Sequence, residues 1–156
     1  MSGESVLAWL ARHAPELALI DHARSTATVA EAAEVLGVEP GRIAKTLAFR
    51  VGDVPMLLIA RGDARLDNQK CKSKLGDRPR MLDAEATLEL TGHAVGGVCP
   101  FGLATALPIL ADRSLLAYPT VFPAAGTRTS SVELEPERLA QLVGARWVDV
   151  CRLPQV

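Results

Sequence analysis

The stretch Ile43-Ala44-Lys45-Thr46-Leu47-Ala48-Phe49-Arg50-Val51 decides the fold of this 156-residue chain. Because side chains alternate across a β-strand, a strand here places one lysine on an otherwise apolar face, formed by Ile43, Lys45, Leu47, Phe49 and Val51. An ammonium group on such a face is costly without a partner. Lys45 therefore either reaches the rim of the sheet or lines a cavity that receives an anion or a carbonyl group. The chain has four lysines against thirteen arginines, which favours a specific role for Lys45.

The sequence on either side of this strand predicts an α/β fold. Residues 52–55 turn the chain into a second apolar run, 56–60, so the two runs read as a hairpin. Thr28-Val29-Ala30-Glu31 is a capping box, which predicts a helix over 29–36 ended by Gly37. Further helices are expected at 5–13, 67–75, 84–90 and 136–143. Short strands are expected at 17–20, 94–96, 108–111, 120–122, 131–134 and 147–150.

Composition excludes several classes of protein. Hydrophobic residues make up 49% of the chain, charged residues 22%, and the formal net charge is −1, as in ordinary globular proteins. No apolar run approaches the roughly 20 residues of a membrane span, and the N-terminus lacks the pattern of a signal peptide. The three cysteines and three histidines show no metal-ligand spacing. We expect a single domain over residues 1–156 that is reduced and cytoplasmic and has no cofactor or metal.

The loop Gly96-Gly97-Val98-Cys99-Pro100-Phe101-Gly102 is the first candidate site. Three glycines and a proline allow a backbone that approaches a ligand closely and offers it N–H groups. It is not a phosphate loop, because no Gly-Lys-Ser/Thr follows. The alternative is a tight turn between strands. Cys99 invites a nucleophile interpretation, with His93 nearby in sequence, but a packed and inert thiol is favoured.

A second candidate is the small and hydroxylic stretch Ala124-Ala125-Gly126-Thr127-Arg128-Thr129-Ser130-Ser131. Hydroxyl groups in such a stretch can hydrogen-bond a polar ligand at the floor of a small pocket. The alternative is a hairpin turn with Gly126 at its tip.

The third candidate is a basic segment at residues 61–80. Its seven cations outnumber its three aspartates and give the segment a charge of +4 in a chain of net charge −1. Lys70 and Lys74 are four residues apart and share a helix face. A local basic patch on an otherwise acidic protein indicates a phosphate-backbone partner. The alternative is a solvated helix face.

Together, Ile43–Phe49, the 96–102 loop and the later Ala-Ala-Gly-Thr-Arg-Thr-Ser-Ser-Val-Glu-Leu-Glu-Pro resemble the YbaK family of aminoacyl-tRNA deacylases. That family includes the editing domain inserted in bacterial prolyl-tRNA synthetases and its free-standing relatives. The resemblance runs from about His22 to about Val143. It implies an α/β domain with a mixed, barrel-like sheet flanked by helices.

The resemblance also implies roles for particular residues. The catalytic set would be Lys45, Gly96, Gly97 and Pro100. The substrate pocket would contain His22, Thr46, Val98, Cys99, Gly102, Gly126, Thr127 and Ser130. The acceptor-stem phosphates of tRNA would meet Arg61, Arg65, Lys70, Lys72, Lys74 and Arg80.

The reaction implied is hydrolysis of a mischarged tRNA, with a small amino acid such as Cys or Ala on tRNA-Pro. Attack would come from a positioned water or from a group of the substrate itself, and loop N–H groups near Gly96 and Gly97 would stabilise the developing oxyanion. Expected partners are the tRNA acceptor stem and 3′ end and prolyl-tRNA synthetase, with no membrane. Two alternatives stay open: a non-catalytic nucleotide or aminoacyl-tRNA binding module, and an interaction domain that docks on a synthetase.

Overall fold

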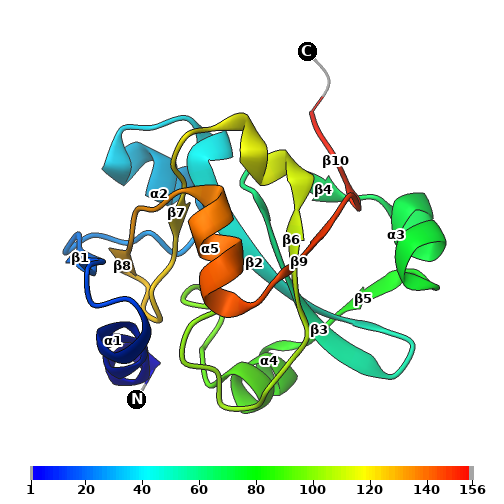
Figure 1. Ribbon diagram of the computed structural model, residues 1–156, viewed down its shortest axis with the longest axis horizontal. Coiled ribbons are helices and arrows are strands. Elements are labelled where there is room, and N and C mark those ends of the chain that lie inside the picture. The colour runs from blue at the N-terminus through cyan, green and yellow to red at the C-terminus, as the bar shows by residue number, and fades with distance from the viewer. Residues whose placement is uncertain (1, 155–156) are drawn as a thin grey trace.

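The computed structural model describes residues 2–154, and its centre is a six-stranded mixed sheet (Figure 1). The strand order is β5-β2-β3-β6-β9, and β7 lies beside β2. The strands are β2 (Ile43–Val51), β3 (Val54–Arg61), β5 (Pro79–Met81), β6 (Ile109–Asp112), β7 (Phe122–Pro123) and β9 (Arg146–Val148). The predicted α/β class is confirmed. The sheet is not closed as a barrel: within residues 2–154 no pairing joins its outer strands β5 and β9.

The predicted hairpin forms the middle of the sheet. β2 and β3 pair antiparallel along their whole length, from Val51 opposite Val54 to Ala44 opposite Arg61. The two residues between the strands make the turn, and Gly52 takes the left-handed conformation there, with φ 60°. β3 then pairs with β6, and β6 with β9, in parallel. The hairpin therefore holds β2 rigidly along one edge.

Two small ribbons lie outside the main sheet. β1 (Ile20–Asp21) pairs with β8 (Ser130–Ser131), and β4 (Arg65–Leu66) pairs with β10 (Cys151–Arg152), both antiparallel. Each ribbon joins segments that are far apart in the chain. The first brings the region before the predicted capping box against the hydroxylic stretch near Ser130.

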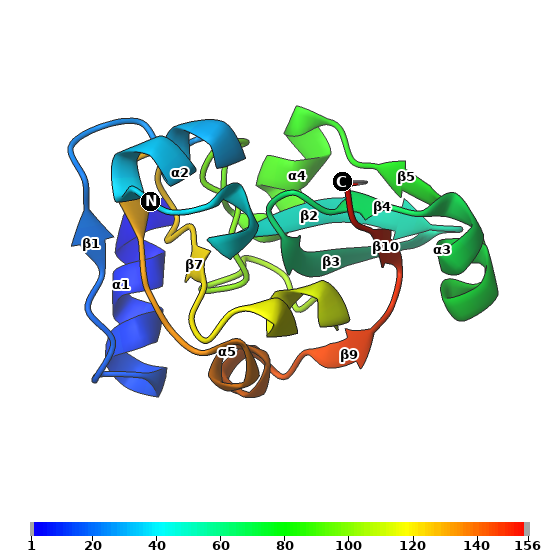
Figure 2. The same cartoon turned by 90° about the horizontal axis from the view of Figure 1, so that it is seen from above.

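The helices are α1 (Ser2–His13), α2 (Val29–Leu36), α3 (Asn68–Leu75), α4 (Ala84–Thr91) and α5 (Pro136–Val143), with short 3₁₀ turns η1 (Pro40–Arg42) and η2 (Arg113–Ala117). Capping sets their ends as predicted. The Thr28 hydroxyl accepts the Glu31 N–H at 3.1 Å, and Gly37 ends α2 with φ 67°. Figure 2 shows α2 and α4 on one side of the central strands, and α5 with β9 on the other.

Two main apolar clusters lie on the two sides of the central hairpin. Phe49 and Leu58 pack in one, beside α3 and β10, together with Leu47 and Val51. Ala44 and Ile59 pack in the other, which α1 and α5 cover. This division confirms the predicted alternation for Leu47, Phe49 and Val51. Ile43, predicted on the same face, instead packs in a third cluster with Phe122 and α2, because β2 begins beside that helix. No helix of the described chain is long and apolar enough to cross a bilayer.

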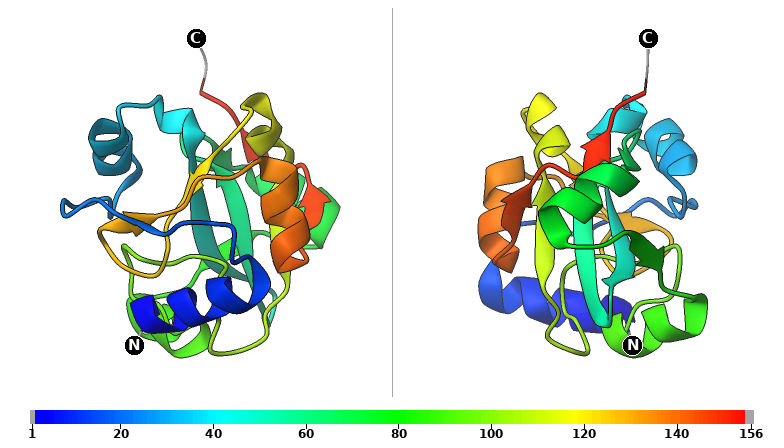
Figure 3. Two further views of the ribbon diagram at one scale, coloured as in Figure 1. Left: turned by 60° about the vertical axis from the view of Figure 1, so that its left-hand side comes forward. Right: turned by 90° about the vertical axis from the view of Figure 1, so that its right-hand side faces the viewer.

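The structure differs from the predictions at the short strands. Residues 94–96 form a turn rather than a strand, because Gly96 takes φ 100° and the Gly97 N–H donates to the Ala94 carbonyl at 2.9 Å. Of the predicted strand at 147–150, only 147–148 belong to β9, and 149–150 connect it to β10. Asp112 accepts the Val150 N–H at 2.9 Å and redirects the chain between them. Figure 3 shows the resulting position of β10 beside α3.

Candidate active site

The edge of β2 that faces away from β3 has a gap. β5 pairs with β2 at Phe49–Val51, and β7 pairs with it at Ile43–Ala44. Beyond β5, the Leu82 N–H still donates to the Ala48 carbonyl at 3.0 Å. No strand residue is paired with this edge at residues 45–47 within the described chain. A short length of strand edge is therefore left for another partner.

Thr46 is the residue whose backbone faces this gap. In a hairpin with a two-residue turn, Val51 and every second residue before it bond to the partner strand, and the residues between point to the other edge. The bond at Ala48 follows that rule. The N–H and C=O of Thr46 are thus directed into the gap. Its hydroxyl oxygen is buried and has no hydrogen-bond partner among residues 2–154.

A pocket of about 340 Å³ opens against the gap. Its walls come from the start of α2, from β2, from the segment between β5 and α4, from the 95–98 loop and from β7 and β8. Five of the residues predicted for the site line it: Lys45, Thr46, Gly96, Val98 and Ser130. The structure thus brings together the three sequence segments that carried the family resemblance.

Lys45 lines the pocket but directs its ammonium group to the carbonyl oxygen of Ala64, in the turn after β3. Burial lowers the pKa of Lys45, while Cys151 and Asp63 oppose that shift. The ammonium group is thus paired with a backbone carbonyl of the protein itself, although Lys45 lines the pocket as one of the two predicted placements required. Lys45 therefore ties the pocket strand to the β3–β4 turn, and its role in deacylation stays a prediction.

The 96–98 loop packs tightly against the 126–128 segment. A side chain at Gly97 would place its Cβ 3.0 Å from the Gly126 carbonyl, and one at Gly96 would come within 3.1 Å of Arg128 Nε. Arg128 also donates to the Val95 carbonyl at 3.1 Å. Glycine is required at positions 96 and 97 because the two segments approach each other too closely for a side chain. The Gly97 N–H is used in the turn, and of this pair only Gly96 lines the pocket.

Cys99 lies behind the pocket wall. It is fully buried, with its Sγ 3.5 Å from His93 Nε2 and 3.6 Å from the Phe101 carbonyl oxygen. Burial raises the pKa of the Cys99 thiol to about 12. A nucleophilic cysteine needs the opposite shift. These observations favour the packed thiol over the nucleophile.

Six other residues predicted for the site also lie outside the pocket wall: His22, Gly97, Pro100, Gly102, Gly126 and Thr127. Gly102 packs against α1, where an added Cβ would lie 2.9 Å from the Ser5 carbonyl oxygen. Pro100 is buried, and Gly126 contacts the 96–98 loop. Thr127 supports the wall from behind, because its Oγ1 lies 2.5 Å from the hydroxyl of Ser130.

His22 and Ser131 form a pair that the sequence did not reveal. His22 Nε2 lies 2.6 Å from Ser131 Oγ, and Ser131 is a buried residue of the pocket wall. The β1–β8 ribbon positions both, and the His22 N–H donates to the Thr129 carbonyl at 2.8 Å. His22 was predicted for the pocket, and Ser131 belongs to the hydroxylic stretch that was a candidate for its floor, but nothing in the sequence indicated that the two residues meet. An imidazole behind a pocket hydroxyl can take a proton from a group bound there.

The predicted tRNA-binding cations lie outside the pocket. Arg61 is held by Asp63, with Nε–Oδ1 at 2.6 Å, and Lys70 is held by Asp149 at 3.0 Å. The exposed members of the set come from three different elements: Arg65 on β4, Lys72 and Lys74 on α3, and Arg80 on β5. Their part in RNA binding stays a prediction. Within residues 2–154 no group of three or more His, Cys, Asp or Glu side chains is placed to hold a metal ion.

Several known proteins are similar to this chain. The "Uncharacterized protein YwhH" of Bacillus subtilis (strain 168) is 48% identical over 130 residues, which cover 82% of this chain and 83% of that protein. The "Putative Cys-tRNA(Pro)/Cys-tRNA(Cys) deacylase EbsC" of Enterococcus faecalis (strain ATCC 700802 / V583) is 32% identical over 124 residues, or 76% and 73% of the two chains. A crystal structure described as "a putative trans-editing enzyme for prolyl tRNA synthetase" superposes with a TM-score of 0.88 at 36% identity, covering 97% of each chain.

A family profile gives the same assignment. The profile described as "Aminoacyl-tRNA editing domain" matches residues 23–142, nearly the same span over which the motifs resemble the YbaK family. That span contains every wall of the pocket. The chain therefore belongs to the aminoacyl-tRNA editing domain family.

Proposed function

We propose that the protein hydrolyses the ester bond between a small amino acid and the 3′ end of a tRNA, and that the pocket along β2 holds the aminoacyl group. Its family and the deacylase and trans-editing descriptions of its relatives support this. The observation that carries the proposal is the gap in the sheet edge. There the backbone of Thr46 faces a pocket whose wall also contains Gly96 and Ser131.

The pocket wall favours a small, weakly polar side chain. Much of it is alanine and valine: Ala27, Ala44, Ala48, Val98 and Ala124. Its volume of about 340 Å³ must also admit part of the terminal ribose. Cysteine and alanine suit such a wall. Because one methylene in an apolar pocket is worth only about 1–3 kcal/mol, discrimination among small amino acids depends on few contacts.

The attack we propose uses an activated water. The water oxygen adds to the ester carbonyl while its proton passes to the Ser131–His22 pair. The N–H groups of Thr46 and Gly96 stabilise the oxyanion of the tetrahedral intermediate. The bond from carbon to the ribose oxygen then breaks, and the proton is returned to that oxygen. Free amino acid and uncharged tRNA are the products. A hydroxyl of the terminal ribose, or the amino acid's own side chain, is the alternative source of the attack.

The tRNA we propose as substrate is tRNA-Pro, with prolyl-tRNA synthetase as the enzyme whose errors are corrected, in the cytoplasm. The descriptions of two relatives support this choice. Lys45 supports the pocket by fixing the β3–β4 turn behind the strand that carries Thr46.

A deacylation assay on a panel of mischarged tRNAs tests the proposal. Cys-tRNA-Pro and Ala-tRNA-Pro are expected to be hydrolysed, and Pro-tRNA-Pro is expected to be spared. A His22→Ala/Ser131→Ala double variant serves as the control for a contaminating hydrolase. Binding of these tRNAs without hydrolysis of any of them would identify a binding module and overturn the proposal.

A further inference from the structure

A second hollow lies at the other end of the molecule, between α3 and β9. Its volume is about 500 Å³, and it shares no lining residue with the pocket along β2. Six residues line it: Lys74, Arg113, Arg146, Trp147, Val148 and Asp149. Figures 1 and 2 place α3 at the end of the molecule opposite α2, which forms part of the first pocket, and Figure 2 shows β9 on the side of the central strands away from α2. We call this hollow the basic groove.

Three cations converge on the basic groove from three distant segments. Lys74 comes from the last turn of α3, Arg113 from the start of η2 and Arg146 from the start of β9. All three side chains belong to exposed residues. In the described part of the chain, none of the three forms an ion pair or donates a side-chain hydrogen bond. Their positive charge is therefore available to a partner.

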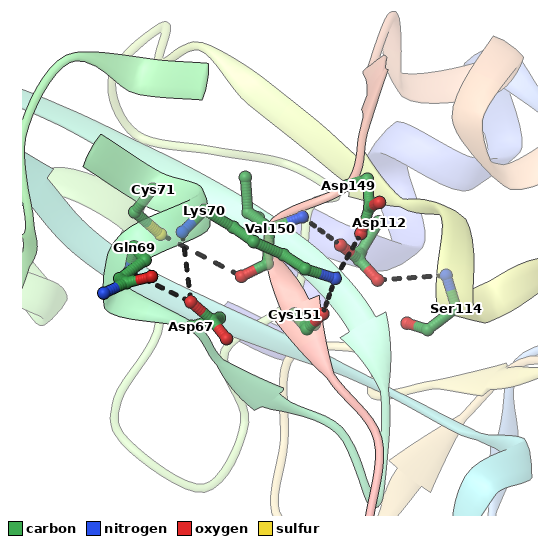
Figure 4. A network of polar contacts seen from close by, with 9 residues as sticks. All are labelled: Asp67, Gln69, Lys70, Cys71, Asp112, Ser114, Asp149, Val150 and Cys151. Carbon is green, nitrogen blue, oxygen red and sulfur yellow. Dashed lines mark hydrogen bonds and ion pairs between the residues drawn. The ribbon is translucent and has the colours of Figure 1, made fainter. Parts of the chain in front are cut away.

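The acidic residue of the groove is already neutralised. Figure 4 shows Lys70 reaching from α3 to Asp149 at 3.0 Å and to the carbonyl oxygen of Cys151 at 2.8 Å. Lys70 is thus used within the fold, although it shares a helix face with Lys74. With Asp149 paired, the groove presents three uncompensated positive charges on a protein whose formal net charge is −1.

A buried carboxylate holds the groove walls together. Asp112 accepts the N–H of Ser114 at 2.9 Å through one oxygen and that of Val150 at 2.9 Å through the other (Figure 4). It thereby ties the turn that carries Arg113 to the chain that follows Arg146. The backbone next to Arg113 and the chain that follows Arg146 are therefore anchored to the same buried carboxylate.

We propose that the basic groove binds the phosphate backbone of RNA, as a second contact with the tRNA whose aminoacyl end occupies the pocket. Arginine binds phosphate oxygens through two parallel N–H donors, and two of the three cations are arginines. Trp147 lines the same groove, and an aromatic side chain in a basic groove can stack on an unpaired base. This inference rests on the proposed function, because it takes its polyanion from the substrate of that reaction.

The test compares two triple variants that change the charge equally. Lys74→Gln/Arg113→Gln/Arg146→Gln removes the cations of the groove. Arg12→Gln/Arg50→Gln/Arg78→Gln is the matched control, because these three arginines are exposed and lie outside both hollows. Binding of uncharged tRNA is measured by fluorescence anisotropy over a series of salt concentrations. Circular dichroism and the oligomeric state of each variant are recorded.

The groove variant is expected to bind uncharged tRNA at least tenfold more weakly at low salt. The slope of log affinity against log salt should fall by about two units, since each phosphate contact contributes about 0.7–0.9. The control variant should keep the wild-type affinity and slope. Equal losses in both variants, or no loss in the folded groove variant, would overturn the inference. So would a groove variant that changes only in oligomeric state, because Arg146 would then merely protect an edge strand.

Two further measurements separate the alternatives. If poly-glutamate binds the wild type as tightly as tRNA and requires the same three cations, the groove serves an acidic protein and the inference fails. Hydrolysis of a 3′-aminoacylated CCA trinucleotide by the wild-type protein tests the proposed function by itself. Failure of that hydrolysis leaves the binding of uncharged tRNA as an independent measurement of the groove.

Discussion

His22 Nε2 lies 2.6 Å from Ser131 Oγ, although 109 positions separate these residues in the chain. The β1–β8 ribbon brings them together, with Asp21 opposite Ser130. The pair combines a proton acceptor with a hydroxyl in the pocket wall. This arrangement is the strongest indication of proton transfer in the site.

Replacing either member of this pair is expected to reduce kcat/KM for deacylation by about 10²–10⁴, the range typical of general acid–base catalysis. Because the two act through one hydrogen bond, His22→Ala/Ser131→Ala should lose little more than the worse single variant. Additive losses in the double variant would show that the pair only shapes the pocket wall.

Thr46→Val is expected to lower activity by at least tenfold without reducing stability. Valine keeps the β-branched shape that suits a strand, and it removes a hydroxyl that is buried without a partner. Thr46→Ser is the matched control and should retain most activity, because it keeps the hydroxyl. The measurements are single-turnover deacylation and thermal unfolding. Wild-type activity in Thr46→Val would exclude the hydroxyl from substrate binding.

Lys45→Met is expected to cut deacylation by about 10²-fold or more while the protein stays folded. Methionine preserves the aliphatic stem and removes the bond to Ala64. Effects of this size follow from small displacements of a substrate-positioning strand. An active and folded Lys45→Met variant would contradict the assigned role.

The same variant has a predicted effect on the pH dependence of stability. Burial lowers the folded-state pKa of Lys45, so between that pKa and the ordinary value near 10.5 the unfolded chain binds more protons. Stability contributed through Lys45 therefore rises with pH across this window. Urea unfolding at several alkaline pH values should show this rise in the wild type and its loss in Lys45→Met. An identical pH dependence in both proteins would show that the lysine is not desolvated.

Cys99→Ala is expected to keep most of the activity and to lose stability through the cavity it leaves. The folded-state pKa of about 12 lies above the usual 9.0, so between these values the unfolded chain releases a proton that the folded protein keeps. The free energy of unfolding contributed through Cys99 therefore falls as pH rises from 9.0 towards 12. The stability of Cys99→Ala should decrease less than that of the wild type over this range. A loss of activity by several orders of magnitude, or a trapped covalent aminoacyl-enzyme, would instead support a nucleophilic Cys99.

The sequence by itself determined the elements whose signals are local. The hydroxyl of Thr28 and the glycine at position 37 define α2, and Asp67 and Gly76 define α3, because caps are bonds between residues three or four positions apart. The alternating pattern of residues 43–51 likewise predicted the strand and its faces. The motifs that carry the family resemblance are also continuous stretches of sequence, although the contact that requires glycine at position 97 is made with the distant Gly126.

Only the tertiary structure decided how those elements meet at the site. The gap beside Thr46 exists because β5 and β7 each pair with only part of one edge of β2. The sequences of these two short strands do not indicate which residues of β2 they pair with. Contacts between different segments place Cys99 behind the pocket wall. They also pair Lys70 with Asp149, so that Lys70 is not available to a ligand. The same holds for the basic groove, whose three cations are brought together by the packing of α3, η2 and β9. Such contacts form where the apolar faces of two elements bury one another. The sequence of one element does not specify which distant element its apolar face will pack against.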